Sequence, residues 1–139
     1  MVSRQILFAI TVFFVASCGE GGIPGQPAGT PPSISNLSVA PISALHDQGG
    51  GWIDVEITVD FVDSEGDVNY LGANVLNSSG SILYVRGALL PELAGQMSGT
   101  AHATIAISTA TVGQFTLRVW MVDETIRPSN QLEVQFSII

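Results

Sequence analysis

The stretch IDVEITVDF, residues 53–61, alternates between apolar and polar side chains at every step. Its apolar members are Ile53, Val55, Ile57, Val59 and Phe61. A helix turns by roughly 100° per residue and would distribute these side chains around its axis, whereas a strand places them all on one face. The stretch therefore predicts a β-strand that buries one face and exposes the other.

Similar alternation, though weaker, recurs along the chain from residue 34 onward. The predicted strands are residues 34–40, 53–61, 70–76, 81–86, 101–107, 115–121 and 132–138. Clusters of turn-forming residues lie between them, such as Gly-Gly-Gly at 49–51, Asn-Ser-Ser-Gly at 77–80 and Arg-Pro-Ser-Asn at 127–130. Because no segment has helical periodicity, the pattern predicts an all-β fold, a seven-stranded antiparallel β-sandwich.

The longest predicted loop covers residues 87–102. Its larger apolar side chains are Leu89, Leu90, Leu93 and Met97. They either close the core between the sheets or form an apolar contact patch. The first interpretation is favoured, because a domain this small needs most of its apolar side chains in the core.

Residues 1–17 have the features of a signal peptide. One arginine precedes the apolar stretch ILFAITVFFVA at 6–16, and a small residue, Ser17, follows. The stretch is shorter than the roughly 20 residues of a transmembrane helix. The only cysteine of the chain, Cys18, comes directly after it.

The sequence VASC at 15–18 resembles the lipobox of bacterial lipoproteins, with Val15 where leucine is commonest. The resemblance implies that Cys18 becomes the first mature residue and carries acyl chains such as palmitate, of which two or three hold a protein firmly on a bilayer. With Gly19 after the cysteine, the sorting habit of this family implies the outer membrane of the cell envelope, with the domain in the periplasm or at the cell surface. The alternative is ordinary secretion with an unpaired thiol, which an oxidising compartment disfavours.

Residues 18–32 form the predicted linker. Nine of the fourteen residues at 19–32 are glycine or proline, a composition that cannot bury a core and suits a tether. The predicted organisation is a signal peptide at 1–17, the lipidated cysteine and linker at 18–32, and the sandwich at 33–139.

Residues 31–139 resemble bacterial immunoglobulin-like modules, including the polycystic-kidney-disease-type and cadherin-like sandwiches of cell-surface proteins. PPSISNLSVAP at 31–41 looks like their first strand, residues 59–80 like their second and third strands with an acidic turn between, and residues 113–138 like their closing hairpin. The cysteine pair and the third-strand tryptophan of antibody domains are missing. The resemblance implies a structural, adhesive or protein-binding role.

Three carboxylates, Asp63, Glu65 and Asp67, follow the strand at 53–61. In an immunoglobulin-like topology their turn lies at the same pole as the turn that holds Asp123 and Glu124. Carboxylates that converge repel one another unless they are solvated, protonated or bridged by a cation. Ca²⁺ takes six to eight oxygen ligands in flexible geometry, so Asp63, Glu65, Asp67 and Asp123 form a candidate calcium site.

The alternative for DSEGD is a structural turn. Asp63 can accept a hydrogen bond from the backbone two residues on, and Gly66 can adopt a positive φ. The segment is not an EF-hand loop, because its glycine is at the fourth position and its twelfth position is Asn74.

Charge and motifs exclude several functions. Twelve Asp and Glu against four Arg give a formal net charge of −8, which argues against nucleic-acid binding. There is no zinc-ligand spacing, no G-x-S-x-G motif and no phosphate-binding glycine loop. The sequence therefore predicts a protein that is not an enzyme.

Trp52, Trp120 and Tyr84 are candidate binding residues, since both tryptophans fall on outward strand positions. One hypothesis is a module that contacts proteins through a sheet edge or loop. The other is a calcium- or glycan-binding module that uses the acidic loops at 63–67 and 123–130. A contiguous aromatic patch near the acidic pole would favour the second hypothesis. Its absence, together with an open apolar edge strand, would favour the first.

Overall fold

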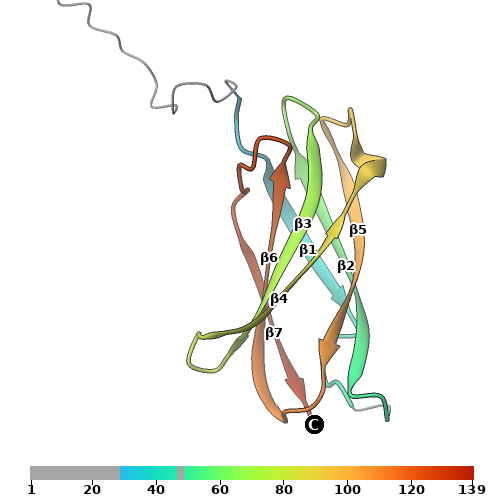
Figure 1. Ribbon diagram of the computed structural model, residues 1–139, viewed down its shortest axis with the longest axis vertical. Coiled ribbons are helices and arrows are strands. Elements are labelled where there is room, and N and C mark those ends of the chain that lie inside the picture. Colours follow the sequence, from blue (N-terminus) through green and yellow to red (C-terminus); the bar gives the residue numbers. More distant parts are fainter. Residues whose placement is uncertain (1–28, 47–48) are drawn as a thin grey trace, which may run out of the picture.

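The computed structural model describes residues 29–46 and 49–139, and Figure 1 shows them as two layers of strands. The elements are β1 (Ser33–Ala40), β2 (Trp52–Val62), β3 (Val68–Asn77), β4 (Ile82–Leu89), the 3₁₀ helix η1 (Pro91–Leu93), β5 (Ser98–Ser108), β6 (Gly113–Asp123) and β7 (Leu132–Ile138). The predicted signal peptide, Cys18 and most of the linker lie outside the described residues. Within the described ranges, no helix is long and apolar enough to span a membrane.

The strands form two antiparallel sheets, with strand orders β1-β2-β5 and β4-β3-β6-β7. This arrangement confirms the predicted seven-stranded β-sandwich. In constant-type immunoglobulin domains the fourth strand belongs to the sheet of the first, second and fifth. Here β4 pairs with β3 instead, from Tyr70↔Leu89 to Leu76↔Ile82.

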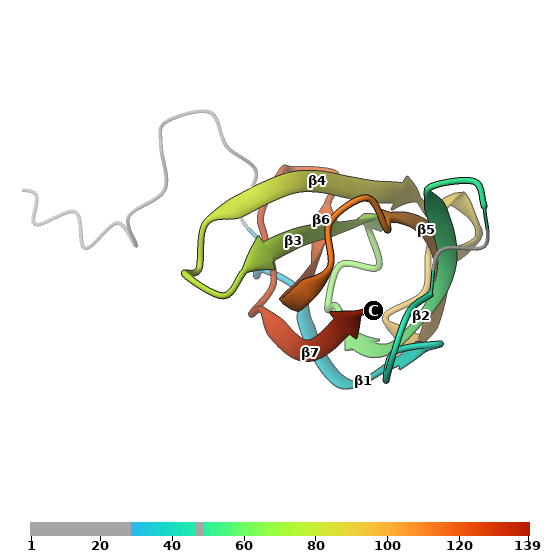
Figure 2. The same cartoon turned by 90° about the horizontal axis from the view of Figure 1, so that it is seen from below.

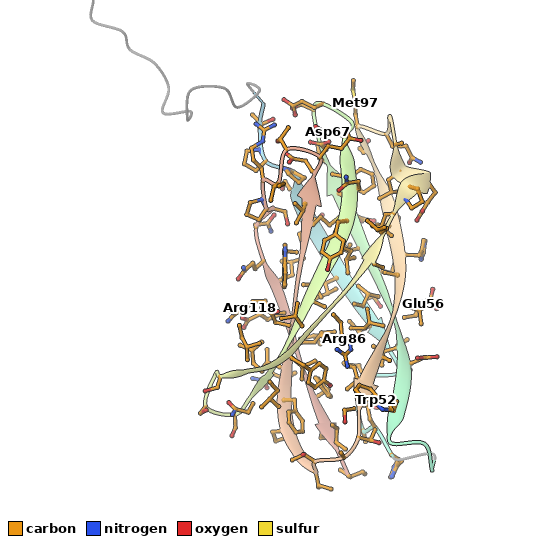
Figure 3. The ribbon with its side chains drawn as sticks, in the orientation of Figure 1. Trp52, Glu56, Asp67, Arg86, Met97 and Arg118 are labelled. Carbon is orange, nitrogen blue, oxygen red and sulfur yellow. The ribbon has the colours of Figure 1, made fainter. Side chains whose placement is uncertain are left out.

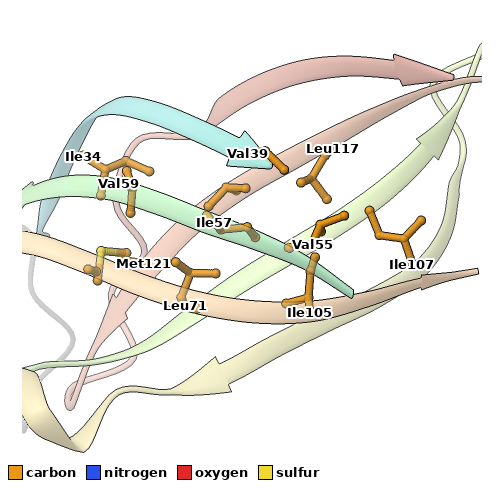
Figure 4. Packing of buried hydrophobic residues seen from close by; sticks show 14 of the residues in the cluster. Ile34, Val39, Val55, Ile57, Val59, Leu71, Ile105, Ile107, Leu117 and Met121 are labelled. Carbon is orange, nitrogen blue, oxygen red and sulfur yellow. The ribbon is translucent and has the colours of Figure 1, made fainter. Parts of the chain in front are cut away.

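The inward faces of the two sheets form one core. The predicted alternation of β2 holds: Val55, Ile57, Val59 and Phe61 are buried, and the polar residues between them face outward. Figure 4 shows this stripe of β2 facing buried residues of the other sheet, Leu71 of β3 and Leu117 and Met121 of β6. Burial of one face per strand stabilises the fold, at roughly 25 cal/mol per Å² of apolar surface.

The connection between β4 and β5 is shorter than predicted. The expected loop at 87–102 was wrong in extent, because β4 runs to Leu89 and β5 begins at Ser98. Leu90 and Leu93 are buried in the core, whereas Leu89 and Met97 are exposed. The core interpretation therefore applies to the first pair and not to the second.

The two sides of the sandwich close differently. After β1 the chain reaches Leu45, which pairs in parallel with Ile138 of β7. The Leu45 N–H donates to the Ser137 carbonyl at 2.8 Å, and the Ile139 N–H donates to the Leu45 carbonyl at 3.0 Å. Figure 2, seen along the strands, shows β7 beside β1 on this side, with β4 approaching β5 on the other.

Leu71→Ala should lower the free energy of unfolding by about 2–5 kcal/mol, because it leaves a cavity where the wild-type side chain is 0% exposed. The matched control is Leu89→Ala, which removes the same atoms from a side chain that is 75% exposed. This control should change stability by less than about 0.5 kcal/mol. Urea unfolding of both variants measures the difference, and equal losses would show that the assigned core is wrong.

Candidate functional site

The predicted acidic pole exists at the upper end of the sandwich in Figure 3, where Asp67 is labelled. We use this name for the carboxylates Asp63, Glu65, Asp67 and Asp123. The Glu124 N–H donates to the Asp67 carbonyl at 3.0 Å, which joins the β6–β7 turn to the β2–β3 turn. The start of the domain reaches the same pole, where the Thr30 N–H donates to Glu65 at 3.0 Å.

Asp123 is 2% exposed and organises the β6–β7 turn. Its Oδ1 accepts hydrogen bonds from the Thr125 N–H at 2.9 Å and the Arg127 N–H at 2.8 Å, and Arg127 Nε lies 3.0 Å from its Oδ2. Arg127 therefore neutralises this carboxylate. Sequence reasoning missed this counter-ion: a spacing of four residues predicts contact on a helix, and this segment is a turn, so the sequence carried no specific signal for it.

Asp63 is 1% exposed and holds the β2–β3 turn. Its Oδ2 accepts the Asp67 N–H at 2.8 Å, four residues on rather than the two that the sequence predicted. Gly66 has φ +69°, which confirms the expected positive φ. The segment DSEGD at 63–67 therefore forms a turn that is held by the Asp63 side chain and the positive φ of Gly66.

Asp63 and Asp67 form a close carboxyl pair. Burial raises the pKa of Asp67, and the hydrogen bond and negative charge of Asp63 raise it further, followed by the charge of Asp123. The Oδ1 atoms of both side chains are buried without a donor from any described residue. A proton on Asp67 would supply that donor and remove the repulsion between the two groups.

Glu65 lies apart from this pair. Its carboxylate accepts hydrogen bonds from the Ser64 hydroxyl and, at 3.0 Å, from the Thr30 N–H; these bonds lower its pKa in that order. No group of three or more His, Cys, Asp or Glu within 29–46 and 49–139 is arranged to hold a metal ion. The four predicted ligands do not surround one point here, and calcium binding stays a prediction.

The aromatic residues divide into two places. The rings of Trp52 and Tyr84 meet edge to face, with centroids 6.4 Å apart. Trp120 lies instead on the outer face of the four-stranded sheet, where a Cβ on Gly72 would come within 2.4 Å of its ring. Figure 3 places Trp52 near the lower end of the molecule, far from Asp67. The patch is therefore not near the acidic pole.

Arg86 completes the group at the lower end, where Figure 3 shows it near Trp52. Its guanidinium carbon lies 4.9 Å from the Trp52 ring centroid and 4.7 Å from that of Tyr84, within the range of cation–π contacts. Sequence reasoning missed Arg86, although it follows Tyr84 by two residues on a strand and so shares its face.

A cleft of about 290 Å³ adjoins these three residues and opens between the edges of the two sheets. We call it the aromatic cleft; Leu83, Phe115 and Ile138 contribute its apolar wall, and Ser108 and Thr111 contribute polar groups. The Tyr84 hydroxyl accepts the Ser108 N–H at 3.0 Å. Burial raises the pKa of Tyr84, so its hydroxyl stays protonated at neutral pH and can donate to a ligand.

A second hollow, of about 320 Å³, lies over the outer face of the four-stranded sheet. It contains the ion pair in which Arg118 Nε lies 2.7 Å from Glu133 Oε1. Its cation is already paired, which distinguishes it from the aromatic cleft.

Comparison with known proteins finds no matching family model and no matching curated protein. Among solved structures, a Niemann-Pick type C2 protein from Japanese carpenter ant is 9% identical, with a TM-score of 0.48 over 82% of this chain and 97% of that one. A Bordetella pertussis protein assigned to ApaA is 14% identical, with a TM-score of 0.37 over 80% and 98%. These values carry no conclusion about ligand or activity.

Asp67→Asn should stabilise the domain at pH 7. A pKa raised by folding gives stability that is complete below the pKa of the unfolded chain and is lost as pH rises through the folded value. An asparagine amide can donate to Asp63 at every pH, which is worth about 1 kcal/mol, or roughly 4–8 °C in melting temperature. Thermal melts from pH 3 to pH 8 should show a flatter profile for the variant than for the wild type.

Glu65→Gln is the matched control. The pKa of Glu65 is lowered in the folded state, so its contribution is lost as pH falls, the opposite direction to Asp67. A lower melting temperature for Asp67→Asn than for the wild type at pH 7 would contradict the assignment of a proton on Asp67 that is donated to Asp63. If millimolar Ca²⁺ also stabilised the wild type and not Asp67→Asn, the pair would be a cation ligand instead.

Proposed function

We propose that this protein is a non-enzymatic, lipid-anchored module of the bacterial cell envelope that binds an extended segment of a partner protein along β4. The observation that carries the proposal is the open apolar edge of this strand. Proteins with an available sheet edge bind partners by strand addition, in which main-chain hydrogen bonds supply affinity and alternate side chains supply specificity.

β4 pairs with β3 on one side only. Its exposed apolar side chains are Ile82, Leu83, Val85 and Leu89. Natural edge strands are usually protected by charge, proline or shortness, because an exposed apolar edge invites pairing with another chain. β4 has eight residues and no proline, and its one charged side chain, Arg86, bonds to the Ala106 carbonyl of β5, so a bound partner would account for the apolar composition of the rest.

The other edges are less suited to this role. Leu45 bonds main chain to main chain with the end of β7, which closes the side shared by β1 and β7. β5 presents polar residues outward, among them Thr100, His102 and Thr104. β4 is therefore the apolar edge with room for a partner strand.

The hydrogen-bond pattern between β3 and β4 shows which backbone groups of β4 point away from β3. The Leu90 N–H donates to the Asn69 carbonyl at 2.8 Å, which fixes this residue pair as hydrogen-bonded. Since hydrogen-bonded and non-hydrogen-bonded pairs alternate in an antiparallel ladder, Val85, Gly87 and Leu89 direct their N–H and C=O groups away from β3. Three residues of the edge are thus oriented for a partner strand, and of their groups the Val85 carbonyl already accepts a hydrogen bond from Arg86 Nη1 at 3.1 Å.

The positions of the aromatic residues bear on the calcium- and glycan-binding alternative. An aromatic patch close to the acidic carboxylates would favour that hypothesis, and Trp52 lies near the other end of the sandwich. Protein binding through the edge of β4 needs no such proximity.

The lipid anchor has its own test in the full chain, expressed in a Gram-negative host. Wild-type protein should incorporate a palmitate analogue and float with outer-membrane vesicles, whereas Cys18→Ser should lose the label and the membrane association. Gly19→Asp should keep the label and move the protein to the inner membrane. Membrane-bound, unlabelled Cys18→Ser would disprove acylation as the anchor.

Strand addition is tested by photo-cross-linking from position 83 in intact cells. A single partner should cross-link, and Val85→Pro should suppress the adduct by at least tenfold, because proline removes an outward N–H without breaking the β3–β4 ladder. Val85→Thr keeps this N–H and should retain the adduct. A cross-linker at the exposed Ile126, in the β6–β7 turn, controls for non-specific reaction. An adduct that survives Val85→Pro, or that forms equally from position 126, would refute binding along β4.

A further inference from the structure

We infer that the aromatic cleft holds the C-terminal residue of the segment bound along β4, with an apolar side chain inside the cleft and the terminal carboxylate on Arg86. The inference rests on the proposed function and adds the chemistry of the partner. Its starting point is that Leu83, Tyr84 and Arg86 of β4 also line the cleft. A partner segment that lies along β4 can therefore place a residue in the cleft while it stays paired with β4.

Arg86 supplies a charge that the described part of the molecule does not neutralise. Of the three described arginines, Arg118 and Arg127 form ion pairs with carboxylates, and Arg86 forms none in residues 29–46 and 49–139. The whole chain has a formal net charge of −8, so carboxylates that could pair with Arg86 are abundant in it. An arginine left unpaired at the wall of a cleft is complementary to an anionic ligand.

The guanidinium is held in position for this purpose. Its Nε donates to the Ala106 carbonyl at 3.2 Å, and its Nη1 donates to the Val85 carbonyl at 3.1 Å. Its Cζ lies over the rings of Trp52 and Tyr84. In the described part of the chain Nη2 has no hydrogen-bond partner, so it can donate to a carboxylate without breaking the existing bonds.

The size and lining of the cleft indicate what kind of ligand carries the negative charge to Arg86. A volume of about 290 Å³ is at the lower limit of ligand pockets, enough for one side chain and too small for a helix. Its wall combines apolar side chains with the Tyr84 hydroxyl and the charge of Arg86. The ligand must therefore join an apolar body to a carboxylate over a short distance.

A C-terminal apolar residue meets this requirement within a single residue. Inside a strand, neighbouring side chains point to opposite faces, and an acidic and an apolar side chain that share a face are two residues, or roughly 7 Å, apart. At a chain end, the carboxylate and the side chain belong to the same Cα. The geometry thus favours a terminal carboxylate over an internal Asp or Glu.

The test uses a pool of octapeptides randomised at every position and synthesised with either a free carboxylate or a C-terminal amide. The purified full-length protein selects peptides from each pool, and mass spectrometry identifies the bound fraction. The wild type should bind the acid pool about tenfold more than the amide pool, the effect of one charge-assisted hydrogen bond. The bound peptides should end in Phe, Leu, Ile or Val.

Three variants separate the contribution of Arg86 to carboxylate binding from that of the β4 backbone to strand binding. Arg86→Gln should bind both pools equally and weakly, whereas Arg118→Gln, the matched control, should behave as the wild type. Val85→Pro should lower binding of both pools while keeping the preference for the acid, because it acts on the strand and not on the carboxylate. Circular dichroism melts confirm that each variant is folded.

The outcomes distinguish the inference from the proposed function. Equal binding of acid and amide by the wild type overturns the cleft assignment and leaves strand addition intact. If N-acetylphenylalanine alone binds as tightly as the selected octapeptides, or if no peptide binds, the cleft does not hold the end of a captured strand. If Arg86→Gln forms dimers in sedimentation experiments while the wild type shows no acid preference, Arg86 protects the edge from self-pairing and the inference fails.

Discussion

The structure depends on how its two seams are closed. A seam is a side of the sandwich where edge strands of the two sheets meet: β1 with β7 on one side, and β4 with β5 on the other. On the β1–β7 side, Leu45 continues the hydrogen bonding of the sheet through main-chain bonds to Ser137 and Ile139. On the other side, β4 and β5 belong to different sheets, and side chains of Tyr84 and Arg86 bridge them in the described residues. On the first side, Asn130 also bonds to both main-chain groups of Ile34. Between β4 and β5 the backbone groups have only the two side-chain bonds of Tyr84 and Arg86 among the described residues. One seam is therefore closed, and the other offers backbone groups and apolar surface to a partner.

The two ends of the sandwich use charge in opposite ways. At the acidic pole, the buried carboxylate of Asp123 is paired with Arg127, and that of Asp63 accepts the backbone of its own turn. Burial of a charge is unfavourable unless such partners are present, so these groups hold the turns in place. At the other end, the described residues give Arg86 carbonyls and aromatic rings but no carboxylate. The charge of Asp123 is thus neutralised within the fold, whereas Arg86 has no carboxylate partner among the described residues.

The strands were predictable where burial imposes a period of two, as at residues 53–61 in the middle of a sheet. The edge strands β1 and β7 were predicted to within one residue. Prediction failed at the end of β4 and the start of β5, where burial is weaker: Leu89 is exposed, and β5 begins with small polar residues from Ser98. Topology alone brought the acidic turns to one pole. It could not assign partners within that pole, because Glu65 turns toward Thr30, and this choice depends on side-chain geometry.

The aromatic residues show why a candidate site needs more than strand assignment. Alternation correctly placed Trp52 and Trp120 on outward positions, but their separation depends on register and sheet order. Trp52 pairs with Ser108 at one end of β2, and Trp120 pairs with Gly72 inside the other sheet. Because Gly72 has no side chain, the ring of Trp120 covers the sheet beside it. Trp52 instead projects at the open seam, where it meets residues of β4, so the same residue type covers backbone at one position and lines a cleft at the other.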